Sequence, residues 1–314
     1  MKKLAQRIPV PIAGLMLALA TTGNLLLSYG SIYRNIFGSI SGLILILLIL
    51  KIFLDFKGIL KDLENPIIAS TIPTFTMGVM ILTTYIKPYI PLVAKGIWIL
   101  AIILHCFLIV YFTVKFILKF NIKKVFPSYF IVYVGIAVVS ITAPAYKALS
   151  FGRVIFWFGF ISYLMLLPIV TYRIFCVKQI QEPALPTIII MAAPPSLCLA
   201  GYISSFQEKS IIMIGFLTIL SLIMFIVSLL YIPKILRGKF YPSYSALTFP
   251  LAITAVAMKQ TNVFLIKNNN SIGALKYLVK IQELIAVSIV IYVLIKYFKF
   301  MFIKDKVELN KVVS

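Results

Sequence analysis

The sequence is poor in the residues that carry most enzyme chemistry. It contains one histidine, three cysteines and eight acidic residues among 314. An odd number of cysteines without paired spacing gives neither a disulfide framework nor a zinc pattern. The sequence also lacks a Walker motif and a G-x-G-x-x-G loop, so ATP does not drive this protein directly. We therefore expect no enzyme, no metal and no cofactor.

The few titratable residues are also poorly placed for catalysis inside a membrane. Of the acidic residues, only Glu283 falls in an apolar run, near its start. No carboxylate pair and no Ser/His/Asp set can be assembled at membrane depth, which excludes intramembrane hydrolysis. His105 lies in the middle of an apolar run, where two interpretations remain open. It is either hydrogen-bonded to a neighbouring helix or part of a proton relay.

Long polar segments are missing as well. Hydrophobic residues make up 62% of the chain and charged residues 12%, against roughly 45–50% and 25% in soluble domains. Ten apolar runs each reach the length of about 20 residues that a membrane-spanning helix needs. What remains is enough for short connections only, which excludes a soluble catalytic domain. The runs lie at about 8–30, 36–54, 66–86, 92–114, 127–147, 152–176, 183–203, 211–233, 242–262 and 278–300.

The first run has a second interpretation, as a secretory signal. Basic residues precede it, and Ala18-Leu19-Ala20 has the pattern of a cleavage site. Pro9, Pro11 and Gly14 interrupt the apolar core that such a signal requires, and another span follows it. We therefore expect the run to be retained as the first helix.

The basic residues indicate topology rather than nucleic-acid binding. The net charge is +22, yet Lys and Arg flank the apolar runs instead of forming one basic domain. Of the 30 basic residues, 20 lie on the side that holds both termini and 10 on the other. Because the cytoplasmic loops of membrane proteins carry an excess of Lys and Arg, we expect both termini in the cytoplasm. Lysine outnumbers arginine 25 to 5, which is common in AT-rich bacterial genomes. We therefore expect a multi-pass protein of the bacterial cytoplasmic (inner) membrane, in contact with lipid.

The odd-numbered runs begin at regular intervals, near residues 8, 66, 127, 183 and 242. A period of about 60 residues is typical of one helical hairpin repeated five times. All five hairpins enter from the same side, so the repeats are parallel. We predict an all-α integral membrane protein of ten transmembrane helices, with a single transmembrane domain over residues 1–314. The hairpins are expected at about 8–54, 66–114, 127–176, 183–233 and 242–300.

Odd and even runs differ in chemistry. Twelve of the 16 prolines lie in odd runs or at their cytoplasmic edges, together with many small and hydroxyl residues. Kinked, partly polar helices are tolerated in lipid only where neighbours or a water-filled cavity satisfy the freed groups. We therefore predict an inner ring of odd helices around a central pore and an outer ring of even helices. The alternative is that these residues serve close packing only. The expected pore-lining residues are Pro11, Gly14, Pro73, Thr74, Gly135, Ser140, Pro194, Ser196, Thr248 and Pro250.

Several short motifs, in order along the chain, resemble a known family. Residues 8–20 (IPVPIAGLMLALA) resemble the first helix of the tellurite-resistance/dicarboxylate transporter (TDT) family, and residues 246–252 (ALTFPLA) resemble its ninth. Residues 133–137 and 142–145 are similar to its fifth helix. The family includes bacterial tellurite-resistance membrane proteins, fungal malate and sulfite transporters, and the slow anion channels of plant guard cells. Its members move different anions, so the resemblance does not choose among them.

The resemblance implies ten helices as five hairpins around a pore, and a homotrimer with one pore per subunit. It also implies a phenylalanine that plugs each pore, which corresponds to Phe249. Pro250 follows directly, and a residue before proline is pushed away from helical geometry. A helix break there would point Phe249 at the pore axis. The other interpretation of Phe249 is an ordinary packing residue.

The residues themselves favour an anion as the transported species. Lys147 and Lys259 end the fifth and ninth helices on the outer side, and no acid lies within an odd run. Cation channels typically carry rings of Asp or Glu. We expect these two lysines to be outer-vestibule cations, and the alternative is ordinary snorkelling at the interface.

The prediction for function is a gated anion channel with passive flux of small inorganic or carboxylate anions. One alternative is a proton-coupled carrier of C4-dicarboxylates, sulfite or tellurite, for which His105 is the only titratable candidate in mid-span. Another is a non-transporting membrane receptor or immunity-type protein, although loops this short leave little to present to a partner.

Overall fold

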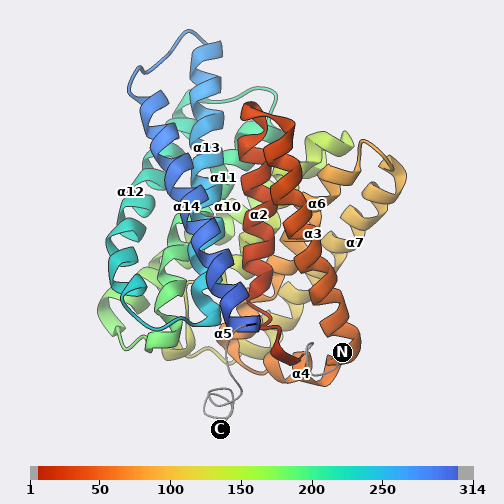
Figure 1. Cartoon of the computed structure of the whole chain (residues 1–314). Coiled ribbons are helices and arrows are strands. Elements are labelled where there is room, and N and C mark those ends of the chain that lie inside the picture. Colours follow the sequence, from red (N-terminus) through yellow and green to blue (C-terminus); the bar gives the residue numbers. More distant parts are fainter. Residues whose placement is uncertain (1–5, 303–314) are drawn as a thin grey trace.

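The computed structural model describes residues 6–302, and all regular secondary structure in that range is helical. The predicted all-α class is confirmed. The two chain ends, which the charge count assigns to the cytoplasm, lie outside the described residues. The long elements (Figure 1) are α2 (Ile12–Leu26), α3 (Ser31–Leu54), α6 (Pro73–Ile86), α7 (Pro91–Phe112), α10 (Leu149–Tyr172), α11 (Ala193–Ser205), α12 (Ile211–Leu236), α13 (Thr248–Lys267) and α14 (Leu275–Phe302).

Short helical segments extend or connect these elements. Several begin with proline, which suits a helix start because its missing N–H has no partner there anyway. They are η1 (Leu27–Tyr29), α4 (Phe56–Asp62), α5 (Pro66–Thr71), η2 (Thr113–Ile117), η3 (Ile122–Lys124), α8 (Tyr129–Tyr133), η4 (Gly135–Ala137), α9 (Val138–Thr142), η5 (Ala143–Tyr146), η6 (Arg173–Val177), η7 (Glu182–Ala192) and η8 (Pro242–Leu247).

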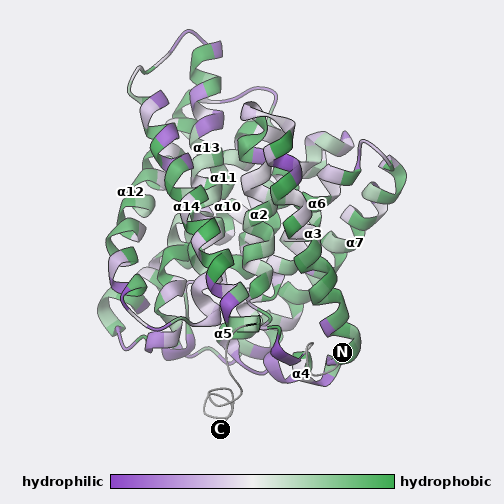
Figure 2. Cartoon of the chain, in the orientation of Figure 1, coloured by the Kyte–Doolittle hydropathy of each residue, from purple (hydrophilic) through white to green (hydrophobic). Residues whose placement is uncertain are grey.

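Within residues 6–302, nine helical stretches are long and apolar enough to cross a membrane. They match nine of the ten predicted runs, and we number the spans after those runs. The fifth run is instead divided into α8, η4, α9 and η5. A β-carbon on Gly135 would lie 2.7 Å from the sulfur of Met77, so a larger residue there would displace the Met77 side chain. Pro144 removes a further backbone donor. Figure 2 shows hydrophilic residues gathered mainly at the two ends of the helices.

Odd and even spans differ in burial as well as in composition. In the most apolar window of the first, third, seventh and ninth spans, 72%, 67%, 94% and 61% of residues are buried. In the even spans the share lies between 28% and 33%. The even helices expose large apolar side chains such as Leu43, Phe107 and Leu230. An apolar surface of this extent suits contact with lipid rather than water.

The packing contacts of the odd spans close a cycle. α2 packs against α6 and α13, α9 packs against α6 and α11, and α11 packs against α13. Each even helix contacts two neighbours in this cycle: α3 contacts α2 and α6, α7 contacts α6 and α8, α10 contacts α9 and α11, α12 contacts α11 and α13, and α14 contacts α13 and α2. The buried helices therefore enclose the middle of the molecule.

Candidate functional site

A cavity lies inside the cycle of odd spans, and all five of them contribute to its wall. We call it the central cavity. Its volume, counted as the space open to the centre of a water molecule, is about 40 Å³. This is room for roughly three water molecules. Its wall includes Pro11 and Gly14 from the first span, Thr74 and Met77 from the third, Val134 and Gly135 from the fifth, Pro194 and Leu197 from the seventh, and Phe249 and Pro250 from the ninth.

The wall of the central cavity is built from apolar, small and hydroxyl side chains. Its hydroxyls are occupied: Thr74 donates to the carbonyl of Thr71 at 2.7 Å, and Ser245 donates to that of Pro242 at 3.3 Å. Such a wall offers a hydrated ion few groups that could replace its water.

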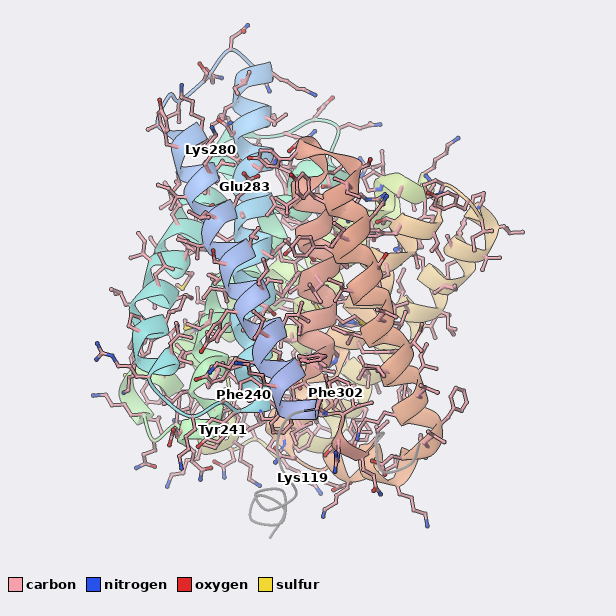
Figure 3. The ribbon with its side chains drawn as sticks, in the orientation of Figure 1. Lys119, Phe240, Tyr241, Lys280, Glu283 and Phe302 are labelled. Carbon is pink, nitrogen blue, oxygen red and sulfur yellow. The ribbon has the colours of Figure 1, made fainter. Side chains whose placement is uncertain are left out.

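A second, wider cavity opens at the end of the molecule where the odd spans begin. We call it the vestibule, and its volume for water centres is about 310 Å³. It shares Pro11, Thr71, Ser245 and Ala246 with the central cavity, so the two spaces meet. Tyr241, another vestibule residue, lies at the end of the molecule opposite Glu283 and Lys280 (Figure 3). The path therefore runs inward from this end and narrows.

Phe249 stands at the narrow part of this path. Its side chain is 6% exposed and lines the central cavity. The ninth span starts as the 3₁₀ segment η8 and becomes α-helical at Thr248, whose hydroxyl donates to the carbonyl of Ser245 at 2.6 Å. Phe249 itself belongs to α13. The break expected at Pro250 thus lies just before Phe249, because proline is tolerated in the first turn of a helix.

The predicted pore-lining residues fall into two groups. One group lies in the wall of the central cavity and consists of Pro11, Gly14, Thr74, Gly135, Pro194 and Pro250. The other group lies outside it, in the packing between helices, and consists of Pro73, Ser140, Ser196 and Thr248.

The hydroxyls of the second group make bonds that join helices. Ser140 donates to the carbonyl of Gly152 at 2.7 Å, which ties α9 to α10. Ser196 lies 2.8 Å from the hydroxyl of Ser221 and 3.0 Å from that of Thr254. Hydroxyl bonds between helices are a usual means of packing in lipid. The segregation of hydroxyls to odd spans therefore has two causes, cavity and packing.

The two predicted outer cations have different surroundings. Lys147 is exposed and adopts a left-handed backbone conformation (φ 55°) after η5. Lys259 donates to Glu283 at 2.6 Å and to the carbonyl of Leu25 at 2.9 Å. The other carboxylate oxygen of Glu283 accepts from the hydroxyl of Tyr29 at 2.6 Å. The charge of Lys259 is therefore compensated, while that of Lys147 is open to water.

His105 belongs to α7, and its side chain is fully buried against the neighbouring helices. Its Nε2 lies 3.2 Å from the carbonyl of Val132 and so carries the proton, since a carbonyl only accepts. Its Nδ1 lies 2.7 Å from the hydroxyl of Thr76. Both ring nitrogens are thus bonded to protein, which favours the interpretation as a packing residue over the proton relay.

Comparison with known families decides the identity of the fold. A family model, SLAC1, described as voltage-dependent anion channel, matches residues 9–298. The chain belongs to the SLAC1 anion channel family. No curated protein matches it in a sequence search. The resemblance seen in the motifs of the first, fifth and ninth helices is therefore confirmed.

Membership in the SLAC1 family makes the chain a multi-pass membrane protein of a family of anion channels and transporters. Sequence reasoning missed two features of the site. Asp62 and Gln181 lie in the vestibule wall, and Glu283 pairs with Lys259. Asp62 belongs to a connection whose helical turn was not predicted. Lys259 and Glu283 lie at similar depth near the outer ends of adjacent spans, and this match in the sequence could have predicted their pairing.

Proposed function

We propose that this SLAC1-family protein is a gated channel for small anions, in which Phe249 closes the central cavity. The observation that carries the proposal is the central cavity itself. All five odd spans surround it, it narrows to a few water molecules, and Phe249 stands in its wall. Flux through such a path is passive, driven by the membrane potential and the anion gradient.

The vestibule supports an anion as the permeant ion. Its wall contains residues that directly precede four odd spans, namely Pro11, Asn65, Gln181 and Tyr241. Some of the first N–H groups are bonded within the chain, as those of Ile67 and Ile68 are to the side chain of Asn65. The aligned peptide dipoles still give the N-terminal end of each helix a partial positive charge. Several such ends around one space favour an anion there. This arrangement follows from the parallel direction of the odd spans.

We also propose that the protein has the architecture expected from its sequence. Ten spans form five parallel hairpins, with odd helices inside and even helices against lipid. The closed cycle of odd spans and the difference in burial support this arrangement. We further propose a homotrimer in the cytoplasmic membrane of a bacterium, with both termini in the cytoplasm, on the family resemblance and the charge bias.

Substitution of Phe249 by alanine tests the gate. Removing the phenyl ring widens the narrowest part of the path, so Phe249→Ala should conduct anions far better than the wild type in planar bilayers. The purified complex should keep its molar mass. If Phe249 is only a packing residue, the same change leaves a cavity that costs about 3–5 kcal/mol by soluble-protein precedent and opens nothing.

Phe156→Ala is the matched control. Phe156 is fully buried and packs on Phe160, Tyr202 and Phe206, outside the wall of the central cavity. Its truncation should lower the melting temperature without raising the current. Equal currents from the two variants, or a destabilised and silent Phe249→Ala, would remove the basis for a gate at Phe249.

A further inference from the structure

The part of the vestibule wall that the structure describes holds one acidic side chain. Asp62 is the last residue of α4, a short helix in the connection between the second and third spans. Its side chain lines the vestibule together with Asn65 and Gln181. Among the described residues of that wall, Asp62 is the only one with a charged side chain, and Tyr241 is the only other titratable one.

Among residues 6–302, the charges around Asp62 leave its carboxylate without a close partner. Lys51 of α3 lies 3.1 Å from Asp55, and both act on Asp62 at longer range, as does Lys61 of its own helix. No ion pair joins Asp62 to another residue within the range 6–302. Burial raises the pKa of the Asp62 carboxyl above its ordinary value. The group therefore takes up a proton more readily than a typical surface aspartate.

We propose that the Asp62 carboxylate is a tethered anion that competes with permeant anions in the vestibule and selects monovalent over divalent ones. The inference rests on the proposed function, since it needs anions to pass this way. Four helix N-termini favour negative charge in the vestibule, and Asp62 supplies one negative charge from the protein itself. A permeant anion must enter against this fixed charge, and an anion of two charges meets twice the repulsion.

The size of the effect follows from Coulomb's law. At about 8 Å in a water-like dielectric, one fixed charge lowers the local concentration of a monovalent anion roughly two- to threefold. For a divalent anion the factor is squared, to about sixfold. Salt reduces both, because the Debye length falls from about 10 Å at 0.1 M to about 3 Å at 1 M. The anion current should therefore depend on the charge of Asp62, on the valence of the anion and on the ionic strength.

The test uses Asp62→Asn in wild-type and Phe249→Ala backgrounds, in excised patches where each side is perfused separately. With 0.1 M salt, where a Debye length of about 10 Å reduces the interaction to about half, the substitution should raise chloride current about 1.5-fold and sulfate current about twofold for anions that enter from the vestibule side. At 1 M salt the gain should disappear. Lowering the pH on that side should raise the current of the parent much more than that of Asp62→Asn, because the described vestibule wall of the variant has no carboxylate to neutralise.

Glu64→Gln is the matched control. Glu64 is two residues away, exposed and paired with Lys115, and it lies outside the vestibule wall. Its neutralisation should leave the ratio of sulfate to chloride current unchanged. If Phe249→Ala conducts anions but Asp62→Asn alters both ions equally, from both sides or at all salt concentrations, the inference about Asp62 is wrong and the channel stands. If Phe249→Ala conducts no anions, the proposed function fails, and the inference fails with it.

Discussion

The ion pair between Lys259 and Glu283 joins the span that carries Phe249 to two neighbours. Lys259 belongs to α13 and Glu283 to α14, and the carbonyl of Leu25 and the hydroxyl of Tyr29 extend the network to the first span. The side chain of Glu283 is 6% exposed and that of Lys259 is 26% exposed. Removing Lys259 should therefore lower the stability by a different amount than removing Glu283, because the charge left behind is buried to a different degree.

Lys259→Met leaves a buried carboxylate with only the hydroxyl of Tyr29 as donor. Breaking a buried pair from one side costs about 3–5 kcal/mol, and we expect about 3 kcal/mol here because one donor remains. Glu283→Gln leaves a partly exposed ammonium that keeps Leu25 and Ser28, so about 1–2 kcal/mol is expected. The double variant removes both charges and should lose about 2 kcal/mol. The coupling between the sites is then about 2–3 kcal/mol.

The assay is reversible unfolding in mixed micelles for the wild type, both single variants and the double variant. The pair formed by Lys115 and Glu64 is the control, because the Glu64 side chain is 68% exposed and that pair should couple by less than about 1 kcal/mol. Additive losses at Lys259 and Glu283, or a Lys259→Met variant as stable as the wild type, would refute the reasoning. Either result would mean that the network is solvated.

Two further predictions concern the path of the ion. Lys147→Gln should lower conductance at low salt and matter less at 1 M, since its exposed charge concentrates anions at the outer end; a loss that is equal at all ionic strengths would indicate a structural role. In a cysteine-free Phe249→Ala background, Thr74→Cys should react with small charged thiol reagents. Ser196→Cys, and Leu47→Cys on the even helix α3 outside the cavity wall, should stay unreactive. Labelling of Ser196→Cys at the rate of Thr74→Cys would contradict its assignment to helix packing.

The sequence predicts the nine continuous spans and the division into two classes, because both depend on composition alone. Apolar length identifies the helices, and the concentration of proline and hydroxyl residues identifies those that are buried. The face that each buried helix turns to the cavity is a different matter. In the seventh span 94% of the window is buried, so every face of the helix is packed and periodicity carries no signal. This is why Thr74 and Ser196 look equivalent in the sequence and differ in the structure.

Contacts of single side chains were even less accessible to sequence reasoning. Asp62 reaches the vestibule because the connection between two spans forms a helical turn there, and the loop sequence gives no cue to its direction. Lys259 ends its helix as expected, but its charge is matched by an acid on the next span. A count of charges along a chain records both residues and does not record their distance.

The division of the fifth span has a consequence for how the central cavity can change its width. A continuous helix moves as one rod, because every backbone bond along it resists bending. The fifth span has junctions between α8, η4, α9 and η5, and Gly135 stands at one of them while also facing the cavity. Each junction can change its angle while the bonds within the segments stay intact. Bending of the fifth span can therefore be confined to these junctions, as it can at the junction between η8 and α13 in the ninth span.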